Sequence, residues 1–389
     1  MILDSRGWPA GAPALRWGGW AAGLSLLLGA PGCGDDPVQP GGEAPDPVRE
    51  VWIGSYAGQA TFGTETGFLL LDVVRTGVAV EARLIFRRPG ETANQVQLAG
   101  TGDDQGFSLG PDPELDYRFT FGVEASRDEV PGLSGELTFG PRDLSASFQC
   151  TPVEVGSLAE RATIGVTGPV TGLAYDGESI WMGTSGQDYQ RWSLDGEFLS
   201  QVVVLYEDSL HWTSGPLTSD GNHLWGHLPG TIIENGEARN VSRILEFTKE
   251  GEITREFMIE HRTGGLAWDN GDLWSLSGSD RLIRVDLDGA VQETVELGLT
   301  TLYGLEYRDG RFWTLGWYEE MLYEIDVQGR VVRVYDLPGT AGTYPSGLVF
   351  AGGDLWYARV QITNPVIRSD VFRLEVGAPE SPAARPAMR

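Results

Sequence analysis

The 389-residue sequence has little cysteine and almost no lysine, and its 55 acidic residues outnumber its 28 basic ones. Two cysteines, Cys33 and Cys150, cannot form a disulfide framework, so we expect stability to come from burial. The formal net charge of −27 argues against binding to nucleic acid or to an anionic membrane surface. Lys249 is the single lysine, and we assign that bias no physical role.

Common catalytic and metal-binding motifs are also missing. The sequence contains no Gly-x-Ser-x-Gly, no His-Glu-x-x-His and no phosphate-binding loop. His223 and His227 flank Leu224-Trp225 in a predicted strand, where four residues span about 13 Å. That separation is too large for two ligands of one zinc ion.

The segment Asp286-Leu287-Asp288-Gly289 resembles part of a calcium-binding loop. If Gly289 took the sixth position of such a loop, Arg284 and Val295 would stand where acids are needed. An Asp-Gly pair between strands is a common hairpin signal, so we interpret the segment as a turn. The sequence therefore predicts no metal and no cofactor.

The N-terminus has the features of a secretory signal. Arg6 and Arg16 come before an apolar stretch at 17–28, which is too short to span a bilayer comfortably. Ending on Gly-Cys33, it resembles a bacterial lipoprotein signal, whose Cys becomes the lipidated mature N-terminus, although Ala30 stands where that family favours Leu. We expect anchoring to the cell envelope, at the outer membrane or cell surface, through Cys33. Plain secretion is the alternative.

Composition shifts along the chain predict five segments. Residues 34–50 are rich in Pro, Gly and acidic residues, which is typical of a flexible tether. The expected segments are a signal peptide (1–32), a tether from Cys33 (33–50), a small antiparallel β domain (51–152), a β-propeller (153–377) and a disordered tail (378–389).

Residues 51–150 contain short runs of alternating apolar and polar residues, separated by Gly, Asp and Pro. Tyr117, Phe119 and Phe121, for example, would point to one face of a strand. Such runs predict a small antiparallel barrel or sandwich. The opening Trp52-x-Gly54-x-Tyr56 is similar to that of lipocalin-like and avidin-like barrels, so both a barrel with a cavity and a solid one stay open.

The second half of the chain repeats one motif five times: Gly-Leu, a short hydrophobic-acidic step, Gly, then an aliphatic-Trp pair. The recurring tryptophans are Trp181, Trp225, Trp274, Trp313 and Trp356, spaced by 44, 49, 39 and 43 residues. This period, with short strands and Gly-rich turns, is typical of a β-propeller with one four-stranded blade per repeat. We expect each of these tryptophans to pack between neighbouring blades.

The fifth repeat stops early, at Val371–Val376, without a fourth strand of its own. Ala162–Val166 precedes the first repeat and has no place in it. We therefore predict that this segment supplies the missing strand and closes a five-bladed ring, so that no long sheet edge is exposed. The alternative is seven blades, with 51–150 counted as two.

Part of the repeat region, about 170–340, resembles the plant and bacterial glutaminyl-peptide cyclotransferases. The resemblance lies in Gly172–Gly177, in Gly304-Leu305-Glu306-Tyr307 with Asp309-Gly310, and in the run from Trp317 to Val332. The resemblance implies the fold of that family, a five-bladed propeller, and its activity, the cyclisation of N-terminal glutamine in peptides.

The pocket residues of that family are mostly not matched. Met182 stands at the position of a pocket Glu in its first blade, and a methionine can neither accept nor donate a proton. Its Asn-Glu-Leu-Glu run is Tyr303–Glu306 here, which keeps only the last Glu, and its Asn-Val-Trp is Leu315–Trp317. We therefore expect the fold to be shared and the cyclase activity to be absent.

Loops at one mouth of the ring are the remaining place for a site. The densest aromatic and acidic cluster is Trp317-Tyr318-Glu319-Glu320, and aromatic anchors with a few polar groups suit a binding patch. A solvated loop with one packed Trp is the alternative interpretation. The candidate binding residues are Trp317, Tyr318, Glu319, Glu320, Arg262, Tyr303 and Tyr344.

Two functions follow from this sequence. The first is a monomeric, lipid-anchored binding or scaffold protein that contacts a protein or peptide with the propeller mouth. The second is a divergent propeller enzyme, a transferase, lyase or hydrolase, using acids at the same mouth. The missing acid in the first blade and the absence of nucleophile motifs favour binding.

Overall fold

A computed structural model of the chain divides it into two units, 1–49 and 50–389. The described residues are 54–377 except 63–64, 77–78, 88–93, 103–105, 112–120, 128–132, 140–143, 185–187, 206–214, 235–236, 278–279, 298, 300–301, 317–320, 338–342 and 364–365. The expected signal peptide, tether and tail, and with them Cys33, lie outside this range. Within it, the chain contains no helix with the length and hydropathy to span a bilayer.

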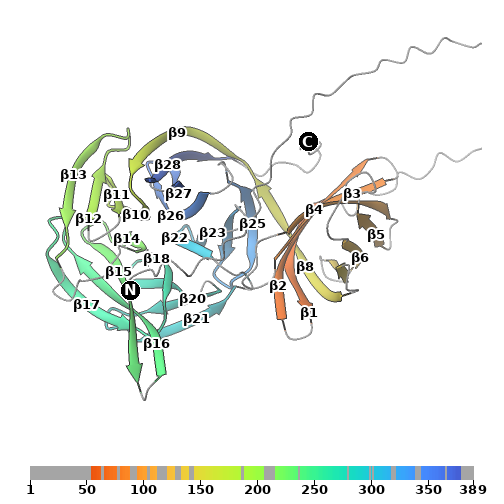
Figure 1. Cartoon of the computed structure of the whole chain (residues 1–389), viewed down its shortest axis with the longest axis horizontal. Helices are drawn as coiled ribbons and strands as arrows, with labels where there is room; N and C mark the ends of the chain where they lie inside the picture. The colour runs from red at the N-terminus through yellow and green to blue at the C-terminus, as the bar shows by residue number, and fades with distance from the viewer. Residues whose placement is uncertain are drawn as a thin grey trace, which may run out of the picture. The chain divides into compact units, whose positions relative to one another are not determined.

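The first eight strands form a closed antiparallel barrel (Figure 1). Each strand pairs with the next, and β1 pairs with β8 to close the circle. This closure excludes both a sandwich and the interpretation of 51–150 as two propeller blades. The strands are β1 (Gly54–Phe62), β2 (Glu65–Thr76), β3 (Ala79–Arg87), β4 (Asn94–Gly102), β5 (Gly106–Pro111), β6 (Phe121–Arg127), β7 (Leu133–Phe139) and β8 (Leu144–Gly156).

Alternate residues of the barrel strands form one buried apolar cluster. Leu69 and Leu71 of β2 join Leu84 of β3 and Phe148 of β8 in it, as period-two alternation predicts. Cys150 belongs to the same cluster, and burial raises the pKa of its thiol far above the usual value. Cys150 is therefore a residue of the barrel core whose thiol stays protonated near neutral pH.

The rest of the described chain folds as an all-β propeller, as the sequence predicts. Its five repeats each give a four-stranded antiparallel group. Repeat 1 comprises β10 (Val170–Tyr175), β11 (Ile180–Thr184), β12 (Asp188–Trp192) and β13 (Phe198–Val203); repeat 2, β14 (Leu217–Ser219), β15 (Leu224–Glu234), β16 (Glu237–Phe247) and β17 (Ile253–Ile259); repeat 3, β18 (Thr263–Asp269), β19 (Asp272–Ser277), β20 (Arg281–Val285) and β21 (Val291–Glu296); repeat 4, β22 (Leu302–Arg308), β23 (Arg311–Gly316), β24 (Met321–Asp326) and β25 (Val331–Asp336); repeat 5, β26 (Thr343–Ala351), β27 (Asp354–Thr363), β28 (Val366–Val376) and β9 (Leu158–Thr167).

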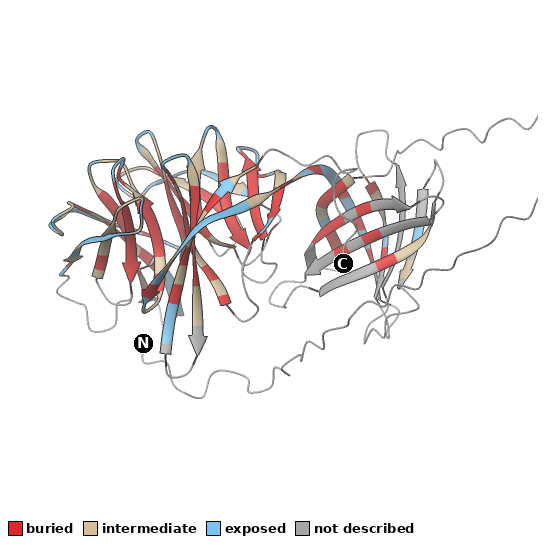
Figure 2. Cartoon of the chain, turned by 90° about the horizontal axis from the view of Figure 1, so that it is seen from above, coloured by how far each residue is buried: buried red, intermediate tan, exposed pale blue. Residues whose placement is uncertain are grey.

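The inner strands of the repeats form a circle. β10, β14, β18, β22 and β26 contact one another in turn, and β26 returns to contact β10, an arrangement that Figure 1 shows around a common centre. Buried residues run along the strands, whereas many turns are exposed (Figure 2). The inner strands of all five repeats begin at the same end of the ring, and we call this end the mouth.

The recurring tryptophans are buried where neighbouring repeats meet, as predicted. Trp225 of repeat 2 stacks on Trp268 of repeat 3, with ring centroids 5.4 Å apart. Trp274 meets Phe312 of repeat 4 edge-on at 4.7 Å. Trp181 lies in one apolar cluster with residues of repeat 2. These aromatic contacts hold adjacent repeats together.

β9 supplies the fourth strand of repeat 5, which confirms the predicted closure. It pairs antiparallel with β28, and the register places Val166 opposite Ser369 and Ile164 opposite Val371. Val166 is buried in the apolar cluster shared by repeats 5 and 1. Just before β9, the last residues of β8 pair in parallel with β25.

The segment from Asp286 to Gly289 is a hairpin turn, as the sequence indicates. Asp286 Oδ1 accepts hydrogen bonds from the backbone N–H groups of Asp288 and Ala290. Gly289 has a φ of 85°, a left-handed conformation that favours glycine. The carboxylate thus serves the turn itself.

Candidate functional site

The sequence-predicted binding residues belong to three neighbouring repeats. Arg262 is exposed and directly precedes β18, whereas Tyr303 and Tyr344 are half-buried in the second positions of β22 and β26. All three therefore lie at the mouth. The loop 317–320, with Trp317, Tyr318, Glu319 and Glu320, lies outside the described residues, so its role as the main anchor stays a prediction.

A buried histidine lies at the same end of repeat 2. His227 of β15 is 4% exposed, and neither ring nitrogen has a hydrogen-bond partner among the described residues. Its imidazole occupies the space next to Gly215, where an added Cβ would lie 2.1 Å from Nδ1. A glycine is therefore required at 215, because any side chain would collide with the ring.

His227, His261 and Arg262 together form what we call the mouth cluster. Burial, together with the positive charges of Arg262 and His261, lowers the pKa of His227 to about 3. Because such charge effects act over short distances, the three side chains lie near one another across the boundary of repeats 2 and 3. His227 is consequently neutral at physiological pH.

His261 is oriented by a chain of hydroxyl groups. Its Nε2 lies 2.9 Å from Ser275 Oγ, which lies 2.7 Å from Thr263 Oγ1 and donates to it. Thr263 Oγ1 donates in turn to the carbonyl oxygen of Gly265 at 2.7 Å. Because each hydroxyl has one proton and uses it further along the chain, His261 Nε2 must be the donor to Ser275. Its Nδ1 then carries a free lone pair.

The charge state of His261 agrees with this assignment. Burial and the nearby charge of Arg281 lower its pKa to about 4, so the ring is neutral at physiological pH. A neutral imidazole held in one tautomer can accept a hydrogen bond or a proton at the open nitrogen. The mouth cluster therefore offers a fixed acceptor beside a cation.

Arg262 supplies that cation. It forms no ion pair within the described part of the chain, whereas arginines outside the mouth, such as Arg284 and Arg373, pair with carboxylates. An exposed, unpaired guanidinium in a protein of net charge −27 is suited to a bidentate carboxylate ligand.

Glu306 is a second unusual group on an inner strand. It is half-buried on β22, opposite Trp313 of β23, and no hydrogen bond or ion pair of its carboxyl occurs among the described residues. Burial raises its pKa to about 8, and Arg308 offsets the rise only in part. Near neutral pH this group is largely a carboxylic acid, which can donate a hydrogen bond or a proton.

Residue 182, where the similar family has a pocket Glu, is closed to solvent. Met182 of β11 is fully buried, in an apolar cluster with Leu173 and Trp356. No proton can be transferred there, as the sequence indicates.

A structural carboxylate recurs at the turn between the first two strands of a repeat. In repeat 1, Asp176 Oδ2 accepts a 3.0 Å hydrogen bond from Trp181 Nε1 and lies 3.0 Å from Lys249 Nζ. Burial acts to raise the pKa of Asp176, but hydrogen bonds from Trp181, from the backbone of Glu178 and Ser179 and from Lys249 outweigh it and lower the pKa to about 2. This carboxylate fixes the turn against its Trp.

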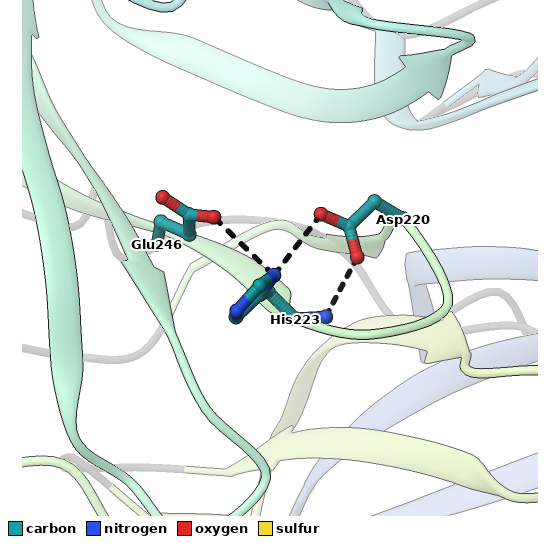
Figure 3. A group of neighbouring side chains, drawn as sticks. All are labelled: Asp220, His223 and Glu246. Carbon is teal, nitrogen blue, oxygen red and sulfur yellow. Dashed lines mark hydrogen bonds and ion pairs between the residues drawn. The ribbon is translucent and has the colours of Figure 1, made fainter.

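The corresponding turn of repeat 2 carries a different cluster, drawn in Figure 3. Asp220, His223 and Glu246 each direct one possible ligand atom to a common point, and these atoms lie within 4.8 Å of one another. His223 Nδ1 is 3.4 Å from Asp220 Oδ2 and 3.3 Å from Glu246 Oε1. The sequence predicts no metal site, but among the described residues this set could hold an ion.

Comparison with known proteins does not place the chain in a family. No protein-family model matches the chain, and no curated protein matches it. Among solved structures, the chain is similar to glutaminyl cyclase from Myxococcus xanthus, with 16% identity, 58% of this chain and 98% of that chain covered, and a TM-score of 0.46.

Two further solved structures are similar to the chain at lower TM-scores. Aldose sugar dehydrogenase from Streptomyces coelicolor, solved with PQQ, has 12% identity over 58% of this chain and 100% of that chain, with a TM-score of 0.35. BamB from Moraxella catarrhalis has 12% identity over 71% of this chain and 99% of that chain, with a TM-score of 0.28. Likenesses of this size carry no argument about this chain, so no residue role is transferred from them.

Proposed function

We propose that this chain is a binding protein whose five-bladed propeller holds a carboxylate-bearing peptide or protein segment at its mouth. The observation that carries the proposal is His227, a buried imidazole with no hydrogen-bond partner in the part of the chain that the structure describes. A buried polar group left unpaired costs about 1–3 kcal/mol of stability. A ligand that hydrogen-bonds the imidazole would remove that cost, and Arg262 beside it would attract a carboxylate.

The surroundings of the mouth cluster suit a peptide. The Nδ1 lone pair of His261 can accept a backbone N–H, while Tyr303 and Tyr344, in repeats 4 and 5, offer half-buried aromatic surface. Aromatic side chains and arginine are enriched where binding energy concentrates at interfaces. The loop 317–320 would add Trp317 and Tyr318 as anchors, with Glu319 and Glu320 setting polarity at the rim.

The test uses the full chain with Cys33→Ser. A library of random peptides, each with a free C-terminus, is screened for peptides that bind it. We expect Arg262→Ala to weaken binding of a selected peptide at least ten-fold, because loss of a central arginine typically costs about 2 kcal/mol or more. Calorimetric titration measures this affinity.

Arg330→Ala is the matched control. It removes the same charge from an exposed arginine in the turn between β24 and β25, at the end of the ring opposite the mouth, and should leave the affinity within about two-fold. Equal affinity for the Arg262→Ala variant and the parent chain would refute binding at the mouth cluster.

We further propose that the protein is lipid-anchored at the bacterial envelope through Cys33. In a bacterial host, Cys33→Ser should abolish incorporation of radiolabelled palmitate and release the protein into the soluble fraction, because the lipidated residue is lost. Wild-type chain analysed in parallel provides the control. Membrane association and mass that do not change would rule the anchor out.

A divergent enzyme is the second candidate, and Glu306 is the specific observation in its favour. A carboxyl group with a pKa near 8 on an inner strand suits a general acid. If the chain were such an enzyme, a bound peptide would be converted, and Glu306→Gln would stop turnover while leaving binding intact. Mass spectrometry of the peptide after incubation separates the two functions.

A further inference from the structure

We propose that Asp220, His223 and Glu246 form a binding site for a divalent transition-metal ion of the zinc class, at the end of repeat 2 opposite the mouth. Two of the three residues belong to the β14–β15 turn and its flank, and Glu246 lies on β16. The site shares no residue with the mouth cluster, so its failure or success is independent of the proposed function.

Two of the three separations between the possible ligand atoms match those around a tetrahedral ion, and the third, between the two carboxylate oxygens, is at most 4.8 Å. With metal–ligand distances of about 2.0–2.1 Å, adjacent ligand atoms around tetrahedral zinc lie about 3.3 Å apart. His223 Nδ1 lies 3.4 Å from Asp220 Oδ2 and 3.3 Å from Glu246 Oε1. Figure 3 shows both carboxylates directed at the same ring nitrogen from different elements. One imidazole and two carboxylates form a ligand set that zinc accepts.

Neighbouring groups hold both carboxylates in place. Asp220 Oδ1 accepts the backbone N–H groups of Asn222 at 2.8 Å and His223 at 2.6 Å. Glu246 Oε2 lies 3.3 Å from Arg255 Nε. Asp220 Oδ2 accepts a 3.3 Å hydrogen bond from Trp225 Nε1, and a carboxylate oxygen has a second lone pair for another contact. Asp220 Oδ2 and Glu246 Oε1 are the oxygens that face His223. Supporting contacts of this kind orient metal ligands before an ion binds.

Comparison with repeat 1 points to a cation at this place. There, Asp176 Oδ2 is neutralised by the ammonium of Lys249 at 3.0 Å, and the carboxylate is fully buried. That lysine lies in the turn between β16 and β17, so repeat 2 supplies the cation that neutralises the carboxylate of repeat 1. Asp220 of repeat 2 has instead the ring nitrogen of His223 beside it, with the second carboxylate, Glu246, on the other side of that nitrogen.

Solvent reaches the proposed site from one side. The His223 side chain is 36% exposed, and those of Asp220 and Glu246 are 14% and 12% exposed. An ion can therefore enter without rearrangement, and water can complete its coordination. Bound there, it would join the turn after β14, an inner strand of three residues, to β16.

The test uses the full chain with Cys33→Ser, so that no thiol outside the barrel core competes for metal. After removal of metal with a chelator, zinc chloride is titrated in a calorimeter, and the melting temperature is measured with and without zinc. We expect each chain to bind one zinc ion with micromolar or tighter affinity, and this binding to depend on the three residues. The melting temperature should rise with zinc concentration. X-ray absorption should show nitrogen and oxygen ligands with one imidazole.

His223→Gln and Glu246→Gln should each weaken that affinity at least ten-fold. Asp176→Asn, which changes the equivalent carboxylate of repeat 1, should leave it unchanged and is the matched control. Circular dichroism checks that every variant is folded. Two outcomes would overturn the proposal: no zinc binding by the folded parent chain, which would make the cluster an ion-pair network only, or binding that survives both His223→Gln and Glu246→Gln.

Discussion

Replacing β9 (Leu158–Thr167) by a Gly/Ser segment of the same length should destabilise the whole propeller. The replacement keeps the connection from β8 to β10 but removes the strand that pairs with β28. It also removes Val166, which is buried, and Ile164 and Leu158, which are partly buried. Burial of an aliphatic side chain contributes about 1.5–3 kcal/mol, so we expect a loss of about 5 kcal/mol.

That loss is comparable to the whole net stability of a typical domain, about 5–15 kcal/mol. Calorimetry should record a melting temperature lower by about 10 °C or more for a unit of this size. Hydrogen exchange should show lost protection in β28. As a control, Ala162→Ser with Thr167→Ser changes two exposed positions of the same strand and should hardly alter melting. A replaced chain that melts like the parent would contradict closure by β9.

Replacing Glu306 by Gln should change how stability depends on pH. The pKa of Glu306 is raised from 4.5 to about 8. Between these values the folded protein therefore holds a proton that the unfolded chain releases. The free energy of unfolding must then fall as pH rises through this window and level off above it, by up to about 5 kcal/mol in total.

Urea unfolding at pH 5, 6, 7, 8 and 9 measures the effect. Glu306→Gln should match the parent near pH 5 and become the more stable protein at pH 8 and above, by about 2 kcal/mol or more. Glu296→Gln on the exposed outer strand β21 is the control and should leave the profile unchanged. If the Glu306→Gln and parent curves ran parallel, the carboxyl group would not be protonated in the folded state.

Much of the fold could be predicted from the sequence because each repeat has Gly and Trp at the same positions. The spacing of Trp181, Trp225 and their equivalents indicates one four-stranded unit per period. The surplus segment Ala162–Val166 pairs with β28 because repeat 5 is one strand short. Such arguments depend on chain order and hydrophobic pattern, which a sequence displays directly.

The candidate site was harder to predict because its contacts cross between strands. Simple alternation cannot align Thr263 with Ser275, since the pairing of β18 with β19 shifts register between Thr263 and Leu266. That irregularity conceals the chain of hydroxyl groups that orients His261. The burial of His227 beneath Gly215 depends on how the chain enters β14, which no local pattern encodes.

The cluster of Asp220, His223 and Glu246 is hidden from sequence reasoning for a related reason. Spacing along the chain suggests His227 as the partner of His223 in a metal site. The actual neighbour of His223 is Glu246, which lies on the next strand, opposite Trp225. Spacing along the chain shows ligands on one element, and cross-strand register is needed to find the others. The role of Trp317 as an anchor stays a prediction.

The central claim, that the mouth holds a carboxylate-bearing segment against His227, is tested most directly by the affinity of the selected peptide for His227→Leu. Removing a buried, unpaired polar group should leave the melting temperature unchanged or slightly higher. The account predicts that this stable variant binds the peptide at least ten-fold more weakly than the parent chain. Undiminished affinity in the folded His227→Leu variant would contradict it.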